Sequence, residues 1–245
     1  GDDDRSRLTL RYEPDAVMVT ENFPREVTDL TLLSYCGPFS AIPRWITRLD
    51  TPRTDYYGLP EGLKVLRLSR NYLRAVTDLP NGLEEFYSSH TEDETNSYRL
   101  PGGDLGSGLP RVPGSLRVLS IPVRGHSQHS IQKIVPESVQ SLTLSGVSAE
   151  MPLDLSFLTR VEELEIMFIH GRRKMPAGSR LILPPSLKRL SLLWSGPKLE
   201  IDRAPHLEEL KIDSRWDKVW TNGVRVLNIE EYARAWHAPK SARSA

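Results

Sequence analysis

The sequence has almost no cysteine, no long apolar run and no net charge. Cys36 is the single cysteine among 245 residues, so the chain cannot form an internal disulfide, which favours a reducing compartment. No stretch of about 18 apolar residues predicts a membrane span, and no signal-peptide pattern stands at the start. The 32 basic residues balance the 32 acidic ones, so no global field favours nucleic acid or an anionic membrane. We therefore expect an intracellular, cytoplasmic protein.

The sequence also lacks the common catalytic and ligand-binding motifs. It contains no phosphate-binding loop, nucleophile elbow, zinc-protease helix or dinucleotide fingerprint. His126 and His129 lie three apart in "RGHSQHS", which we expect to be a loop, and no cysteine or carboxylate pair accompanies them. Cys36 in "SYCGPF" is better explained as a packed thiol than as a nucleophile. We expect no catalytic residues, no metal site, no cofactor and no enzymatic activity.

A short pattern of leucines recurs instead. In "LPEGLKVLRLSRNYL", residues 59–73, Leu66 and Leu68 are two positions apart, which is the spacing of residues on one side of a strand. Leu63 precedes them by three positions and Pro60 precedes Leu63 by three. The stretch thus reads P-x-x-L-x-x-L-x-L, and Asn71 follows three positions after Leu68.

This pattern recurs along the chain, with other aliphatic or aromatic residues standing for leucine. Neighbouring units are 17 to 26 residues apart, with one gap of 33 between the units that start at Leu83 and Leu116. Each unit is too small to bury its own apolar face, so the units must stack and share one core. The first leucine position of each unit is held by Val27, Ile46, Leu63, Leu83, Leu116, Val139, Val161, Leu187, Leu207 and Val224.

The alternation also predicts which side chains point away from the core. The Leu-x-Leu pair of each unit faces inward from a short strand, and successive strands pair in parallel. Only Asn71 supplies the asparagine that usually follows such strands, so we expect an irregular spine with short extended segments in place of regular helices. The outward positions are Thr9, Thr31, Asp50, Arg67, Tyr87, Ser120, Thr143, Glu165, Ser191, Lys211 and Asn228.

The chain resembles the leucine-rich repeat (LRR) family from about residue 8 to 231. Its "LPEGLKVL", "LPNGLEEF" and "LPPSLKRL" segments are similar to the short proline-led repeats of bacterial effectors, and to related repeats in protists and large viruses. The resemblance implies a β-rich α/β fold: a curved solenoid of about ten or eleven irregular repeats, with a parallel sheet on its concave face. It also implies binding of another macromolecule without catalysis by the repeats.

Several segments depart from the repeat. Within a solenoid domain of residues 1–231, we expect residues 1–7 to be flexible and insertions at 91–111 and 170–180. Each insertion is either a binding loop or a plain solvated loop. "NIEEYARAWHA", residues 228–238, has apolar residues at helical spacing and predicts a C-terminal capping helix, followed by a flexible tail at 239–245.

The predicted contacts of a protein partner follow from the register and from large side chains. Phe168 and Trp194 follow the strands of neighbouring units, where they form an exposed ridge or turn into the core. Arg67 and Tyr87 are the large outward residues on two adjacent units, and Arg215 follows a later strand. The predicted partner-binding residues are Arg67, Tyr87, Phe168, Trp194 and Arg215.

The leading functional hypothesis is a non-enzymatic module that recognises a protein partner with its curved surface. One alternative is a structural subunit of a larger assembly, which could contain RNA held by Arg172, Arg173 and Lys174. Nucleic acid is the less favoured partner, because no aromatic residues interleave with these basic ones. Another alternative is the substrate-recognition part of a ubiquitin ligase, which the resemblance to effector repeats implies.

Overall fold

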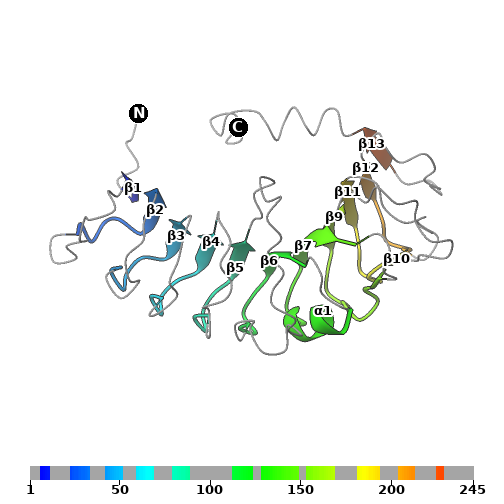
Figure 1. The fold of residues 1–245 in the computed structure, drawn as a ribbon, viewed down its shortest axis with the longest axis horizontal. Helices are drawn as coiled ribbons and strands as arrows, with labels where there is room; N and C mark the ends of the chain where they lie inside the picture. The colour runs from blue at the N-terminus through cyan, green and yellow to red at the C-terminus, as the bar shows by residue number, and fades with distance from the viewer. Residues whose placement is uncertain are drawn as a thin grey trace. The chain divides into compact units, whose positions relative to one another are not determined.

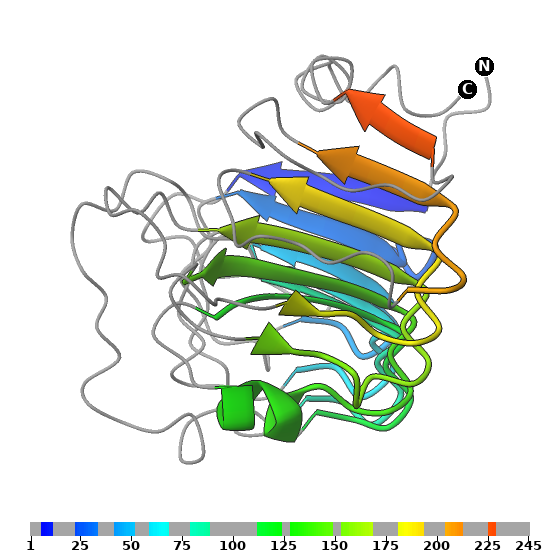
Figure 2. The same ribbon diagram turned by 90° about the vertical axis from the view of Figure 1, so that its right-hand side faces the viewer.

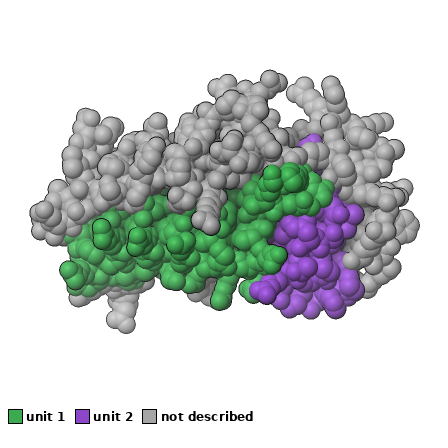
Figure 3. Space-filling model, turned by 90° about the horizontal axis from the view of Figure 1, so that it is seen from below, with its two compact units in different colours: residues 1–141 green, residues 142–245 purple. Residues whose placement is uncertain are grey.

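The computed structural model describes a series of short strands joined by turns. The described residues are 6–11, 23–33, 42–51, 59–68, 79–88, 112–123, 128–148, 153–168, 181–193, 204–212 and 225–228. The chain divides into two compact units, unit 1 with residues 1–141 and unit 2 with residues 142–245 (Figure 3).

Unit 1 is a stack of parallel strands that pair in chain order (Figure 1). Each strand is four or five residues long and pairs with the strand of the next coil. A short helix, α1 (Gln128–Ile134), lies on the side of its coil away from strand β6 (Figure 1). The strands are β1 (Arg7–Arg11), β2 (Asp29–Leu33), β3 (Arg48–Thr51), β4 (Val65–Leu68), β5 (Glu85–Ser88) and β6 (Val118–Pro122).

Unit 2 repeats this construction and adds a small second sheet (Figure 2). Its main strands follow the order β7, β9, β11, β12, β13, and β7 begins at the boundary residue Ser141. The second sheet is the parallel pair of β8 (Leu153–Asp154) and β10 (Leu181–Ile182). The main strands are β7 (Ser141–Val147), β9 (Glu163–Phe168), β11 (Arg189–Leu193), β12 (Glu209–Ile212) and β13 (Arg225–Asn228).

The proline-led spacing is explained by a tight turn before each strand. The carbonyl oxygen of Pro60 accepts a hydrogen bond from the backbone N–H of Leu63 at 3.1 Å, which closes a four-residue turn. Proline suits the first position of this turn because only its carbonyl is used there. The same bond joins Pro24, Pro43, Pro80, Pro113, Pro136 and Pro184 to the residue three positions later, at 3.0–3.3 Å.

The leucine pattern is explained by the core. Leu30, Leu49 and Leu66 pair with one another across β2, β3 and β4, and all three are fully buried. Burying a leucine side chain contributes about 1.5–3 kcal/mol, so a column of such residues is the main favourable term in stacking the coils. The described coils therefore form an LRR-like parallel β-sheet solenoid, as the sequence predicts.

The long gap between two units does not interrupt the stack. Phe86 on β5 pairs directly with Leu119 on β6, although 33 residues separate them. The predicted insertion at 91–111 therefore leaves the strand ladder of unit 1 intact. The predicted insertion at 170–180, Asn71 and most of the predicted cap helix at 228–238 lie outside the described residues, as does the tail at 239–245.

Two sequence expectations about secondary structure and register are wrong. His129 lies in helix α1 and not in a loop, because Ile131 and Ile134 bury one side of this helical turn. The last strand is also offset by one residue: Leu210 pairs with Val226, where the repeat spacing places Leu227. Asn228 consequently pairs with Ile212 and not with the outward residue Lys211.

Candidate partner-binding surface

The outward residues of unit 1 form one continuous row across its strands. Thr9, Thr31, Asp50, Arg67, Tyr87 and Ser120 are successive Cα partners from β1 to β6, which confirms the predicted register. We call these six residues the outward row. Threonine, aspartate and serine make most of it small and polar, so its two large side chains stand out at the centre, on β4 and β5.

These two large side chains contact each other. The guanidinium carbon of Arg67 lies 4.7 Å from the centre of the Tyr87 ring, within the range of a cation–π interaction. The contact follows from the strand pairing, since Arg67 and Tyr87 are direct partners on β4 and β5. Two of the five predicted contact residues are thus brought together.

Tyr87 is itself held in place by its own strand. Its hydroxyl donates a hydrogen bond of 2.9 Å to Oε2 of Glu85, two residues earlier on the same side of β5. Burial raises the pKa of Tyr87 above its ordinary value of 10.0; the bond to Glu85 and its charge act in the same direction, against a smaller opposite effect of Arg67. The ring is therefore neutral at physiological pH and fixed at both its face and its hydroxyl.

Arg67 forms no ion pair with any residue that the structure describes. Its Nε atom is buried and lacks a hydrogen-bond acceptor. Elsewhere on the same side of the sheet, Arg7 and Arg48 both lie near Asp29, with Nε to Oδ2 distances of 3.5 and 3.8 Å. Arg67 at the centre of the outward row thus differs from Arg7 and Arg48 in having no ion pair among the described residues, although Asp50 is its direct neighbour on β3.

Unit 2 has a different outward face. Ser191 on β11 lies between Glu165 on β9 and Lys211 on β12, so a small side chain separates two opposite charges. The hydroxyl of Ser191 is buried and has no hydrogen-bond partner. None of these three residues provides an aromatic surface.

Phe168 is not part of a binding surface. Its side chain is 1% exposed and continues the inward column of Leu164 and Ile166 on β9, so its prediction as a contact residue is wrong. The alternative that it turns into the core is the one that the structure shows. Strand β9 is longer than the repeat pattern requires. Because side chains alternate between the two faces of a strand, its last residue, Phe168, falls on the inward face.

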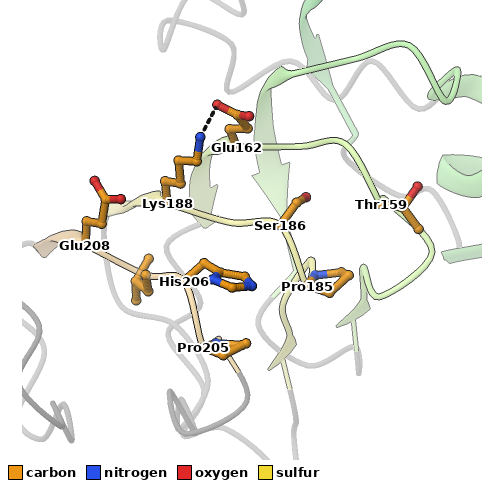
Figure 4. A pocket seen from close by; sticks show the side chains of 9 residues that line it. Thr159, Glu162, Pro185, Ser186, Lys188, Pro205, His206 and Glu208 are labelled. Atoms are coloured by element: carbon orange, nitrogen blue, oxygen red, sulfur yellow. Dashed lines mark ion pairs between the residues drawn. The ribbon is translucent and has the colours of Figure 1, made fainter.

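Unit 2 also contains a groove along the turns that precede β9, β11 and β12 (Figure 4). Its volume is about 710 Å³, and Pro185, Pro205 and Leu207 supply its apolar part. Lys188 bridges to Glu162 at 3.0 Å across the groove, whereas Glu208 is exposed and has no charged partner among the described residues. Both side chains of this ion pair are about half exposed.

Serine residues bridge the coils in a way that the leucine pattern does not reveal. The hydroxyl of Ser138 donates to the carbonyl oxygen of Leu116 at 2.7 Å, and Ser186 donates to Val161 at 2.8 Å. Ser115 reaches the carbonyl of Leu83 at 2.7 Å. Each serine precedes the first leucine position of its unit, so "PGSL", "PESV" and "PPSL" were the available signal.

Several predicted residues lie outside the described part of the chain. Trp194, Arg215 and Cys36 belong to this set, as do Arg172, Arg173 and Lys174. Within the described ranges, no three His, Cys, Asp or Glu side chains are grouped so that they could hold a metal ion. No helix among those ranges is both long and apolar enough to cross a bilayer.

Comparison with known proteins gives a distant likeness to a solved structure. No protein-family model matches the chain, and no curated protein matches it. Among solved structures, the chain is similar to one described as CroV588, a novel circular LRR protein, with 15% sequence identity and a TM-score of 0.39. The likeness covers 85% of this chain and 28% of that one, so this chain spans little more than a quarter of that protein's length.

Proposed function

We propose that this chain is a non-enzymatic interaction module that recognises a protein partner through the outward row of unit 1. The observation that carries the proposal is the contact between Arg67 and Tyr87 at the centre of that row. Arginine and tyrosine are over-represented among the residues that dominate binding energy at protein interfaces. A mostly small and polar row around them leaves room for a partner to approach.

The rigidity of this arrangement supports recognition by a preformed surface. Arg67 and Tyr87 stand on neighbouring strands whose backbones are paired, and Glu85 fixes the tyrosine hydroxyl. A side chain that is already ordered loses about 0.5–1.5 kcal/mol less conformational freedom on binding than a mobile one. The stacked pair therefore contributes more of its contact energy to affinity than two unconstrained side chains would.

Affinity capture from native lysate with three forms of the chain tests this function. We expect the unaltered chain to retain a protein that an Arg67→Ala/Tyr87→Ala variant loses. A Lys64→Ala variant is the matched control, since Lys64 is exposed on the turn beside β4 and pairs with Glu84 at 2.9 Å, away from the outward row. Circular dichroism verifies that all three forms fold.

Binding of the purified partner then separates this function from its alternatives. Calorimetry with purified components should reproduce the loss in the double variant. Capture that nuclease treatment abolishes would favour the RNA-containing assembly, and retention of the partner by the double variant would contradict recognition by the outward row. A partner that is ubiquitinated only in the presence of this chain would support the substrate-recognition alternative.

A further inference from the structure

The unpaired charge of Arg67 indicates what kind of group it binds. Its guanidinium is stacked on Tyr87, forms no ion pair among the described residues, and has a buried Nε without an acceptor. The buried Nε is closed to a ligand, so the remaining donors of this guanidinium are the ones that an anion can bind. Arg7 and Arg48 show the contrasting state, because Asp29 lies next to both.

The geometry limits how an anion can reach Arg67. The strand pairing places Tyr87 on one side of this partly exposed arginine and Asp50 on the other. Since Nε is covered, the two terminal amino groups are the donors that a ligand can approach. A planar group with two oxygen atoms matches that pair of donors, as carboxylates do in bidentate contacts with arginine.

The surrounding charges favour an anion with one negative charge. Asp50 on β3 is the direct neighbour of the arginine, and Glu85 on β5 lies diagonally from it and already accepts the tyrosine hydroxyl. A dianionic phosphate would face repulsion from two neighbouring carboxylates, whereas a carboxylate brings half that charge. Next to them, Ser120 and Val118 on β6 present small side chains over which the rest of a peptide can lie.

We infer that Arg67 is the anchoring site for a carboxylate of the partner protein, supplied by an aspartate or glutamate side chain, with the Tyr87 ring as its supporting wall. The inference rests on the proposed function and specifies its partner: a segment with one acidic residue at Arg67 that lies across β4, β5 and β6. The affinity then depends on a single charge-assisted contact at the centre of the row, surrounded by weaker contacts with small polar residues.

A random twelve-residue peptide library displayed on phage and selected on the full chain tests this inference. We expect the selected peptides to share an acidic residue. Replacing that residue by its amide should weaken binding at least tenfold in calorimetry, and an Arg67→Lys variant should show the same loss with the acidic peptide. An Arg48→Lys variant is the matched control, because Arg48 is an arginine of the same sheet that already has Asp29 beside it.

The other outcomes overturn the inference in distinguishable ways. If the library yields no binding peptide, or if the amide peptide binds equally well, no carboxylate is recognised. If inorganic phosphate displaces the peptide from the unaltered chain at constant ionic strength, the site binds phosphate in preference to a carboxylate. If Tyr87→Ala abolishes peptide binding and Arg67→Lys does not, the proposed function survives without a carboxylate at Arg67. If neither variant changes peptide binding, both proposals fail.

Discussion

Units 1 and 2 bury the same types of residue, mainly leucine and other aliphatic residues. The charged residues on their strands, however, follow one another in opposite sign order. In unit 1, Asp29 lies between Arg7 and Arg48 on paired strands, a row of positive, negative and positive charges. In unit 2, Arg189 lies between Glu163 and Glu209, so that the signs are reversed. The turns show the same contrast, with Lys64, Glu84 and Arg117 in unit 1 and Glu162, Lys188 and Glu208 in unit 2.

This contrast distinguishes the inward residues, which the stacking of the repeats requires, from the outward residues, which can differ between units. Inward leucines are exchangeable between units because they only need to fill the core, whereas each outward column can carry its own sequence. The charges that alternate within a column stabilise the neighbouring coil in either sign order, so they do not determine a partner. What differs in kind is the stacked Arg67 and Tyr87 pair of unit 1, for which the described residues of unit 2 offer no counterpart.

The largest expected effect tests whether the two cores are equivalent. Phe86 in unit 1 and Phe168 in unit 2 are 2% and 1% exposed, so replacing either by alanine should cost about 3–5 kcal/mol of folding free energy. Urea unfolding followed by circular dichroism measures both. Met167→Ala, at the half-buried neighbouring position, should cost clearly less. If Phe168→Ala left the free energy of unfolding unchanged, the side chain of Phe168 would have to lie at the surface.

The serine hydrogen bonds between coils should contribute equally to the free energy of unfolding in both units. Ser138→Ala and Ser186→Ala each remove a hydrogen bond to the carbonyl of the preceding coil, and each should lower the free energy of unfolding by about 1 kcal/mol. Gly82 occupies the same place in its unit, and an added Cβ would lie 3.6 Å from Lys64 Nζ, an ordinary contact. Gly82→Ser should therefore stabilise the fold; a loss of stability would show that this bridge cannot form there.

The stability effects of replacing Arg67 and Tyr87 should be energetically coupled, unlike those of an outward pair in unit 2 that makes no such contact. A double-mutant cycle with Arg67→Ala and Tyr87→Ala should give an interaction energy of about 0.5–1 kcal/mol in urea unfolding. Ser191 and Lys211, which are adjacent outward partners in unit 2, supply the control cycle and should show no coupling. Equal coupling in the two cycles would remove the distinction between the units.

The charged columns should contribute little, and with the same salt dependence in both units. Lys188→Ala breaks the bridge to Glu162, and Lys64→Ala breaks the bridge to Glu84; each should cost the fold little stability, because both pairs are solvent-exposed. Raising the salt concentration should reduce both costs, because the pairs are about half exposed. Thermal unfolding at low and high salt measures the effect, and a cost that persists at high salt would indicate packing.

The smallest effect concerns alkaline pH in unit 1. Because the pKa of Tyr87 is raised above 10.0, the folded state retains the phenolic proton where the unfolded chain releases it. The stabilisation is complete below that value and is lost as the pH rises through the pKa of the folded state. Carbon NMR of the tyrosine rings, with Tyr87→Phe for assignment, should show that the Tyr87 ring ionises at a higher pH than free tyrosine.

The inward columns could be predicted from the sequence because two spacings, Leu-x-x-Leu and Leu-x-Leu, are imposed by the turn and by the strand. The spacing does not give strand length, which is why the place of Phe168 could not be decided. It does not fix the last register either: Val226 and Leu227 are both apolar, and the choice between them depends on chain geometry. The pair of Arg67 and Tyr87 was predicted as two contacts, but their stacking depends on side-chain placement. Helix α1 did leave a signal, since Ile131, Ile134 and Val135 follow helical spacing.

Site-specific photo-crosslinking in native lysate tests the central claim most directly. A benzoylphenylalanine placed at Ser120, which pairs with Tyr87 in the outward row, should form an adduct with a protein partner. The same group at Glu137, an exposed position in the turn before β7, should not. Adducts from Ser120 alone would place the partner on the outward row of unit 1. Adducts from Glu137 with none from Ser120 would contradict this account.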